Sequence, residues 1–138
     1  MWVLYALLSA FFAALTAIFG KIGVTNINSN LATAIRTIVV LVLIWMIVFM
    51  RGEAKGISSI SKYNLTFLIL SGVASGLSWL FYYRALQIGN VSQVATLDKL
   101  SIALVIIFAA LFLNETITLK TAIGAGLVML GALVLVIK

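Results

Sequence analysis

Five apolar stretches, each long enough to cross a lipid bilayer, dominate this chain of 138 residues. A transmembrane helix needs about 20 mainly apolar residues, and the stretches cover approximately 2–22, 31–50, 65–88, 93–113 and 119–137. With 64% hydrophobic and only 9% charged residues, the chain has too little polar surface to cover a soluble globule. The sequence therefore predicts an all-α membrane protein with five transmembrane helices.

The segments between these stretches are short and rich in turn-forming residues. They read VTNINSN, RGEAKGISSISKYN, QIGNVSQ and NETITL, so consecutive helices should run antiparallel. The first stretch lacks a basic start and is longer than the core of a usual signal peptide, which favours a retained helix. We expect a single domain over residues 1–138.

Residue types on which most enzymes and metal sites depend are scarce. The chain has no cysteine and no histidine, which removes thiol chemistry and the commonest general base and metal ligand. Its only carboxylates are Glu53, Asp98 and Glu115. The net charge of +6 is spread over loops and helix ends, so nucleic-acid binding is not indicated. We expect no enzyme, no cofactor and no metal site.

The charges give little preference for one orientation in the membrane. We call side A the face with Met1 and the loop after the second helix, and side B the opposite face. Side A then carries Arg51, Lys55, Lys62 and Lys120, and side B carries Lys21, Arg36, Arg84, Lys99 and Lys138. Counting only charges in or next to loops favours a cytoplasmic N-terminus. Two interpretations stay open: a single orientation, or both orientations in one cell membrane, where inverted copies could pair as the halves of a transporter.

Several of these charges lie inside the predicted spans, where a central charge costs about 2.5 to 3.5 kcal/mol. Snorkelling of the long side chain to the interface suffices for Lys21 and Lys138. For Arg36 and Arg84, snorkelling and a functional role both stay open.

Asp98 is different, because its short side chain cannot reach water from its position in the fourth stretch. Neighbouring residues on a helix do not face each other, so Lys99 should be a poor partner. We expect an ion pair with Arg84 or Arg36 from another helix.

One face of the third helix is polar and aromatic. Serines and a tyrosine follow helical spacing at Ser71, Ser75, Ser78 and Tyr82, beside Gly72, Gly76, Trp79 and Tyr83. The two glycines are best interpreted as helix packing, since small residues at this spacing let membrane helices approach closely. The three aromatic residues could equally line a pocket, because their polar edges need partners.

The segment YYRALQIGNVSQVATLDKLSIALVIIFAALFLNETITLKTAIGAGLVMLGALVLV resembles the terminal part of an EamA domain of the drug/metabolite transporter superfamily. Its single-domain length, with DKLS in the fourth helix, is similar to the five-helix bacterial and archaeal subgroup. Most family members carry two such domains in inverted orientation, so the resemblance implies one half of an inverted-repeat transporter. Many two-domain relatives have a proline near the position of Ser101, whereas this chain has none, so a proline hinge is not implied.

These features predict a half-size secondary transporter, an exporter of a small anionic or zwitterionic metabolite, working as an antiparallel homodimer. The excess of Arg36, Arg84 and Lys99 over Asp98 favours a solute of that charge. The candidate substrate-binding residues are Arg36, Ser75, Ser78, Trp79, Tyr82, Tyr83, Arg84, Asp98 and Lys99, and Asp98 is also the candidate coupling residue. The alternative is a non-transporting membrane partner, or a subunit of a lipid-carrier flippase, that acts with another protein.

Overall fold

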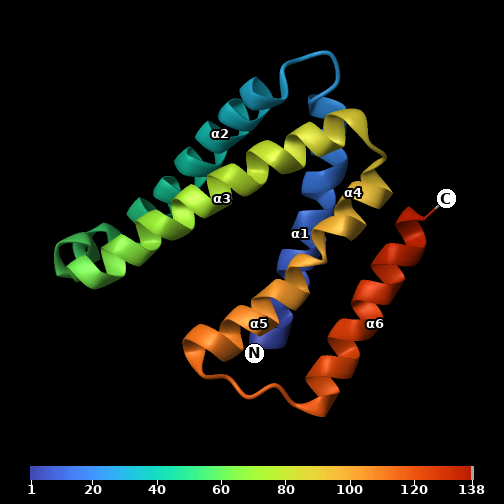
Figure 1. The fold of residues 1–138 in the computed structure, drawn as a ribbon. Coiled ribbons are helices and arrows are strands. Elements are labelled where there is room, and N and C mark those ends of the chain that lie inside the picture. Colours follow the sequence, from blue (N-terminus) through green and yellow to red (C-terminus); the bar gives the residue numbers. More distant parts are fainter. Residues whose placement is uncertain (138) are drawn as a thin grey trace. The chain divides into compact units, whose positions relative to one another are not determined.

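The computed structural model describes residues 1–137 as helices joined by short loops (Figure 1). The elements are α1 (Trp2–Gly23), α2 (Ser29–Met50), the 3₁₀ helix η1 (Glu53–Ser59), α3 (Lys62–Ile88), α4 (Val91–Asp98), α5 (Ser101–Leu113) and α6 (Leu119–Val136). No strand occurs within residues 1–137. Five segments are long and apolar enough to cross a membrane, with α4 and α5 together forming the fourth. The predicted all-α membrane fold is therefore confirmed. Lys138, counted above on side B, lies outside the described residues.

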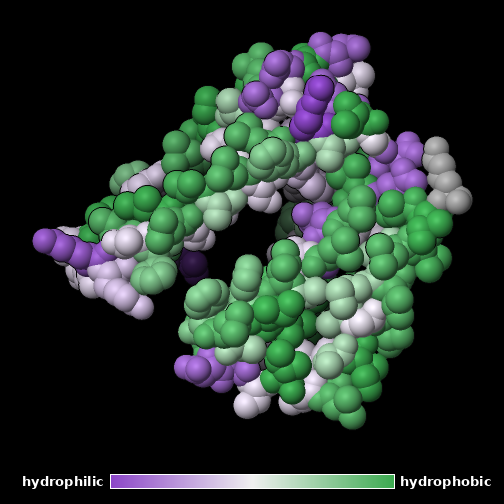
Figure 2. Space-filling view, in the orientation of Figure 1, coloured by the Kyte–Doolittle hydropathy of each residue, from purple (hydrophilic) through white to green (hydrophobic). Residues whose placement is uncertain are grey.

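The spans expose most of their apolar side chains. At most 11% of the most apolar window of any span is buried within the chain, and hydrophobic residues cover most of the face seen in Figure 2. A span of this kind meets lipid, which replaces the protein core as the apolar environment of its side chains. The buried interior is correspondingly small.

Short polar side chains set the helix ends. The side chain of Asn28 accepts a hydrogen bond from the backbone N–H of Asn30 at 2.8 Å and begins α2. Thr118 does the same for α6, accepting from the N–H of Thr121 at 3.1 Å. Asn114 ends α5 in the left-handed conformation with φ of 53°, which asparagine tolerates better than most residues. The predicted turn-forming separators thus act as caps.

The fourth span is interrupted, which the sequence did not predict. α4 ends at Asp98 and α5 begins at Ser101. The backbone N–H groups of Lys99 and Leu100 donate to carbonyls three residues earlier, at 3.1 and 2.9 Å, and those of residues 102 and 103 do likewise. Such bonds characterise a tighter 3₁₀ turn rather than an α-helix. The span therefore changes its geometry between the two helices without a proline.

The chain forms two compact units, divided within α1. One unit is Phe19–Gln87 and contains the end of α1, α2, η1 and most of α3. The other contains Met1–Ile18 and the chain from Ile88 onward, in which α6 packs beside α4 and α5. The candidate site residues from Arg36 to Arg84 belong to the first unit, and Asp98 and Lys99 belong to the second.

Candidate functional site: an arginine on an aromatic wall

Arg36 of α2 makes cation–π contacts with two aromatic side chains of α3. Its Cζ lies 4.2 Å from the centre of the Trp79 ring and 5.5 Å from that of the Tyr83 ring. The two rings are four residues apart on one helix and therefore form neighbouring parts of one wall. The Nη1 atom of Arg36 is buried and has no hydrogen-bond partner among the described residues. Neither of the two ion pairs within residues 1–137 includes Arg36.

The cost of placing this guanidinium in a membrane exceeds the stabilisation that its aromatic contacts contribute. An arginine at the centre of a membrane helix costs about 2.5 to 3.5 kcal/mol. A desolvated cation–π contact returns about 2 kcal/mol. Part of the cost of the membrane charge therefore stays uncompensated, and the Nη1 donor has no acceptor among the described residues. An anion from outside the chain would compensate the charge and accept the hydrogen bond.

Tyr83 is held in place by the end of α1. Its side chain is 5% exposed, and it fills the space that a side chain at Gly20 would occupy. A Cβ atom placed on Gly20 would lie 3.1 Å from the Tyr83 hydroxyl and 3.4 Å from a methyl group of Leu86. This contact was not predictable from the sequence, because Gly20 lies more than 60 residues before Tyr83.

A methyl group at Gly20 should therefore destabilise the protein. Overpacking of a filled site costs about 1 to 3 kcal/mol, against a helix-propensity gain of up to about 1 kcal/mol for alanine. We expect Gly20→Ala to be less stable than Gly23→Ala by roughly 1 to 2 kcal/mol, because a Cβ at Gly23, in the same helix, would meet nothing within 4 Å. Unfolding of the purified protein in mixed detergent micelles measures the difference. Equal stabilities of the two variants would show that Tyr83 moves aside freely.

Polar side chains tie the end of α3 to α1 and to the loop between α1 and α2. Gln87 donates through Nε2 to the backbone carbonyl of Ile27 at 2.7 Å and accepts from Arg84 Nη1 at 2.7 Å. Lys21 donates to the carbonyl of Leu86. Lys21 therefore bonds protein backbone, a contact that the sequence did not predict, and its snorkelling to the interface stays a prediction. Gln87 was missed as a site residue because its partner carbonyl at Ile27 lies 60 residues earlier in the chain.

The other predicted residues of α3 are less enclosed. Ser75 and Tyr82 are half-buried and Ser78 is exposed. The Tyr82 ring centre lies 6.4 Å from that of Tyr83, so Tyr82 continues the aromatic surface. Arg84 is exposed and holds Gln87. Their roles in substrate binding stay predictions.

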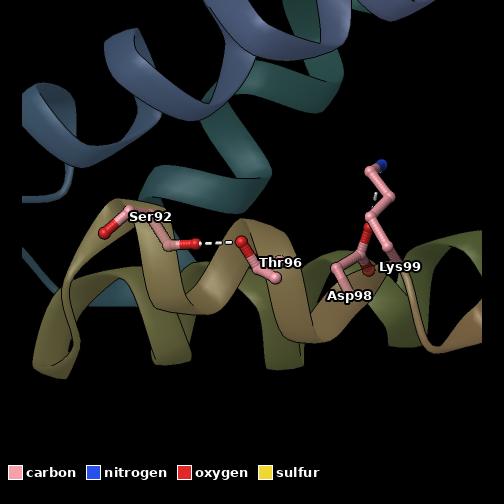
Figure 3. A network of polar contacts seen from close by, with 4 residues as sticks. All are labelled: Ser92, Thr96, Asp98 and Lys99. Carbon is pink, nitrogen blue, oxygen red and sulfur yellow. Dashed lines mark hydrogen bonds and ion pairs between the residues drawn. The ribbon is translucent and has the colours of Figure 1, made fainter. Parts of the chain in front are cut away.

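Asp98 and Lys99 contact each other at the end of α4 (Figure 3). Lys99 Nζ lies 3.6 Å from Asp98 Oδ2, with the two side chains 54% and 44% exposed within the chain. The expectation that adjacent residues would face apart is therefore wrong here. Its basis was a continuous α-helix, whereas α4 ends at Asp98 and the flexible Lys99 side chain can turn back. One turn earlier, the Thr96 hydroxyl donates to the Ser92 carbonyl at 2.6 Å.

Asp98 and the two arginines belong to different units. An ion pair of Asp98 with Arg84 or Arg36 therefore stays a prediction. Within Phe19–Gln87, the predicted residues that come together are Arg36, Trp79 and Tyr83.

Five apolar spans define an integral, multi-pass membrane protein. The EamA-like transporter family matches residues 1–137, and the chain belongs to this family of membrane transporters. It is 50% identical over 136 residues to an uncharacterized transporter in the cobO 3′ region of Sinorhizobium sp., covering 99% of this chain and 96% of that protein. It is 31% identical, with the same coverage, to an uncharacterized protein of Methanocaldococcus jannaschii. No solved structure matches the chain.

Proposed function

We propose that the chain is a half-size secondary transporter that exports a small anionic or zwitterionic metabolite across the cell membrane. The observation that carries this proposal is the Arg36 guanidinium, which has an aromatic wall, a buried Nη1 without an acceptor, and no carboxylate partner among the described residues. Cationic solutes would meet repulsion at this position, whereas an oxyanion would supply the missing acceptor.

The proposed substrate site consists of the Arg36 cluster together with the polar residues predicted from the sequence. Arg36 binds the anionic group, and Trp79, Tyr82 and Tyr83 form the wall. Ser75, Ser78, Arg84, Asp98 and Lys99 complete the lining in the assembled transporter. Asp98 couples transport to proton uptake or to substrate binding through a change of its partner.

We further propose an antiparallel homodimer, because a five-helix chain has one half of the spans that an inverted-repeat transporter needs. The nearly balanced charges of sides A and B support insertion in both orientations. The alternative is a membrane partner or flippase subunit that acts only with a second protein, and in that case its orientation would be single.

Labelling of single cysteines tests the homodimer. The chain has no cysteine, so Thr25→Cys reports the loop between α1 and α2, and Ser58→Cys reports the loop between α2 and α3. Both residues are exposed, and Thr25 is a better site than Asn28, whose side chain caps α2. With a membrane-impermeant maleimide on intact cells, we expect each variant to be labelled in part. Complete labelling of one variant and none of the other would contradict the inverted dimer.

A further inference from the structure

We infer that the Arg36 site takes a carboxylate solute without an ammonium group, a narrower class than the anion or zwitterion proposed above, and this inference rests on that proposed function. The planar shape of the guanidinium restricts the direction from which an acceptor can bond it. The N–H bonds of a guanidinium lie in its plane, and planar carboxylates pair with them edge-on through two oxygens. Trp79, with its ring centre 4.2 Å from Cζ, covers one side of the group. Nη1 lacks a partner within residues 1–137 but is buried, so an acceptor that bonds it must displace the side chains that cover it.

The positions of the carboxylates in the chain disfavour a solute ammonium group. Beside the Arg36 cation, which already occupies the aromatic wall, such a group would be best compensated by an acidic partner, and the three acids are Glu53, Asp98 and Glu115. Glu53 lies in η1, beyond the far end of α2, and pairs with Arg51 at 3.7 Å. It is also the sole carboxylate in Phe19–Gln87. The Arg36 unit therefore offers no acid for a solute ammonium.

The remaining two acids, Asp98 and Glu115, supply no surplus negative charge for a solute ammonium. Asp98, proposed above as part of the lining, brings the adjacent Lys99 with it, at 3.6 Å, so the two residues together add no net negative charge for a solute ammonium. Glu115 lies in the loop between α5 and α6, at the side A end of the fourth span. The Arg36 unit also contains Lys21 and Arg84, which bond the Leu86 carbonyl and the Gln87 side chain. Its surplus charge is positive, so an amino group on the solute would be repelled.

The aromatic wall favours a solute with an apolar remainder. Trp79 is only half-buried, so its ring leaves an apolar surface beside the guanidinium, and the buried Tyr83 adjoins it one helical turn away. The apolar remainder of a small carboxylate would lie on such a surface, whereas inorganic phosphate would present polar oxygens to it.

A binding series with three solutes of similar size tests this inference. Propionate carries the carboxylate alone, alanine carries both charged groups, and ethylammonium carries the cation alone. The purified full-length chain with Trp2→Phe and Trp45→Phe retains Trp79 as its single tryptophan, and its fluorescence reports binding beside Arg36. We expect a saturable change with propionate, at least tenfold weaker binding of alanine, and no saturable change with ethylammonium.

Several results would overturn the inference. They are alanine binding as tightly as propionate, inorganic phosphate binding more tightly than propionate, or no saturable change with propionate. In the same single-tryptophan chain, Arg36→Lys keeps the charge but loses the planar pair of donors, and we expect it to weaken propionate binding at least tenfold. Unchanged affinity in a folded Arg36→Lys protein would also refute the edge-on carboxylate site.

Flux measurements separate this inference from the proposed function. Saturable propionate binding without movement of any small carboxylate across liposomes would support the binding site and refute transport by the chain alone. Alanine flux without propionate binding would support transport and refute the carboxylate site.

Discussion

Arg36→Gln is expected to abolish solute flux while leaving the protein folded. Truncating one partner of a desolvated charge pair costs about 2 to 5 kcal/mol of binding, a loss of roughly thirtyfold to several thousandfold in affinity. Stability should change little, because the lost cation–π contact, about 2 kcal/mol, is offset by removal of a membrane charge that costs about 2.5 to 3.5 kcal/mol. Flux in proteoliposomes and the elution profile of the purified variant measure the two effects.

Arg51→Gln is the matched control for this variant. Arg51 is 70% exposed and pairs with Glu53 at 3.7 Å, and exposed pairs of this kind contribute about 0 to 1 kcal/mol. We expect its flux to stay close to that of the unmodified chain. Equal flux in the Arg36 and Arg51 variants would remove Arg36 from the substrate site.

Asp98→Asn is expected to abolish coupled flux with insertion and folding largely intact. The replacement keeps the size of the side chain and removes a carboxylate from the fourth span. Its contact with Lys99 joins two side chains that are about half exposed within the chain, so its loss should cost little stability. Flux into proteoliposomes with and without an imposed pH gradient, alongside the yield of folded protein, tests both parts.

Glu115→Gln is the control, because it removes a carboxylate from the loop after the same span. It should leave coupling unchanged. Normal coupled flux in Asp98→Asn would contradict the coupling role. Failure of Asp98→Asn to fold would instead assign the carboxylate a structural role, as expected if its loss strands a buried arginine.

The positions of the spans were predictable because transmembrane helices are signalled by length and apolarity alone. The interruption of the fourth span was not, since neither glycine nor proline lies between Asp98 and Ser101. A change from α to 3₁₀ bonding depends on small differences in backbone geometry that the composition of the segment does not record.

The candidate site was predictable only in part, because sequence patterns report spacing within one helix and not contacts between helices. Helical spacing placed Trp79 and Tyr83 on one face, and the cost of a membrane charge singled out Arg36. The contacts of Gly20 with Tyr83 and of Gln87 with Ile27 join residues about 60 positions apart, and periodicity within one helix carries no information about them. Lys99 was judged a poor partner of Asp98 for a different reason, because a continuous helix was assumed where a helix end occurs.

Counterflow by the purified chain alone is the most direct measurement of the central claim. Liposomes containing only this protein and loaded with unlabelled succinate, a small carboxylate that crosses lipid far more slowly than propionic acid, should accumulate labelled succinate from outside, and Arg36→Gln should reduce the accumulation to that of protein-free liposomes. No accumulation by the folded, unmodified chain for any small carboxylate, with flux appearing only after a second membrane protein is added, would contradict transport by a homodimer.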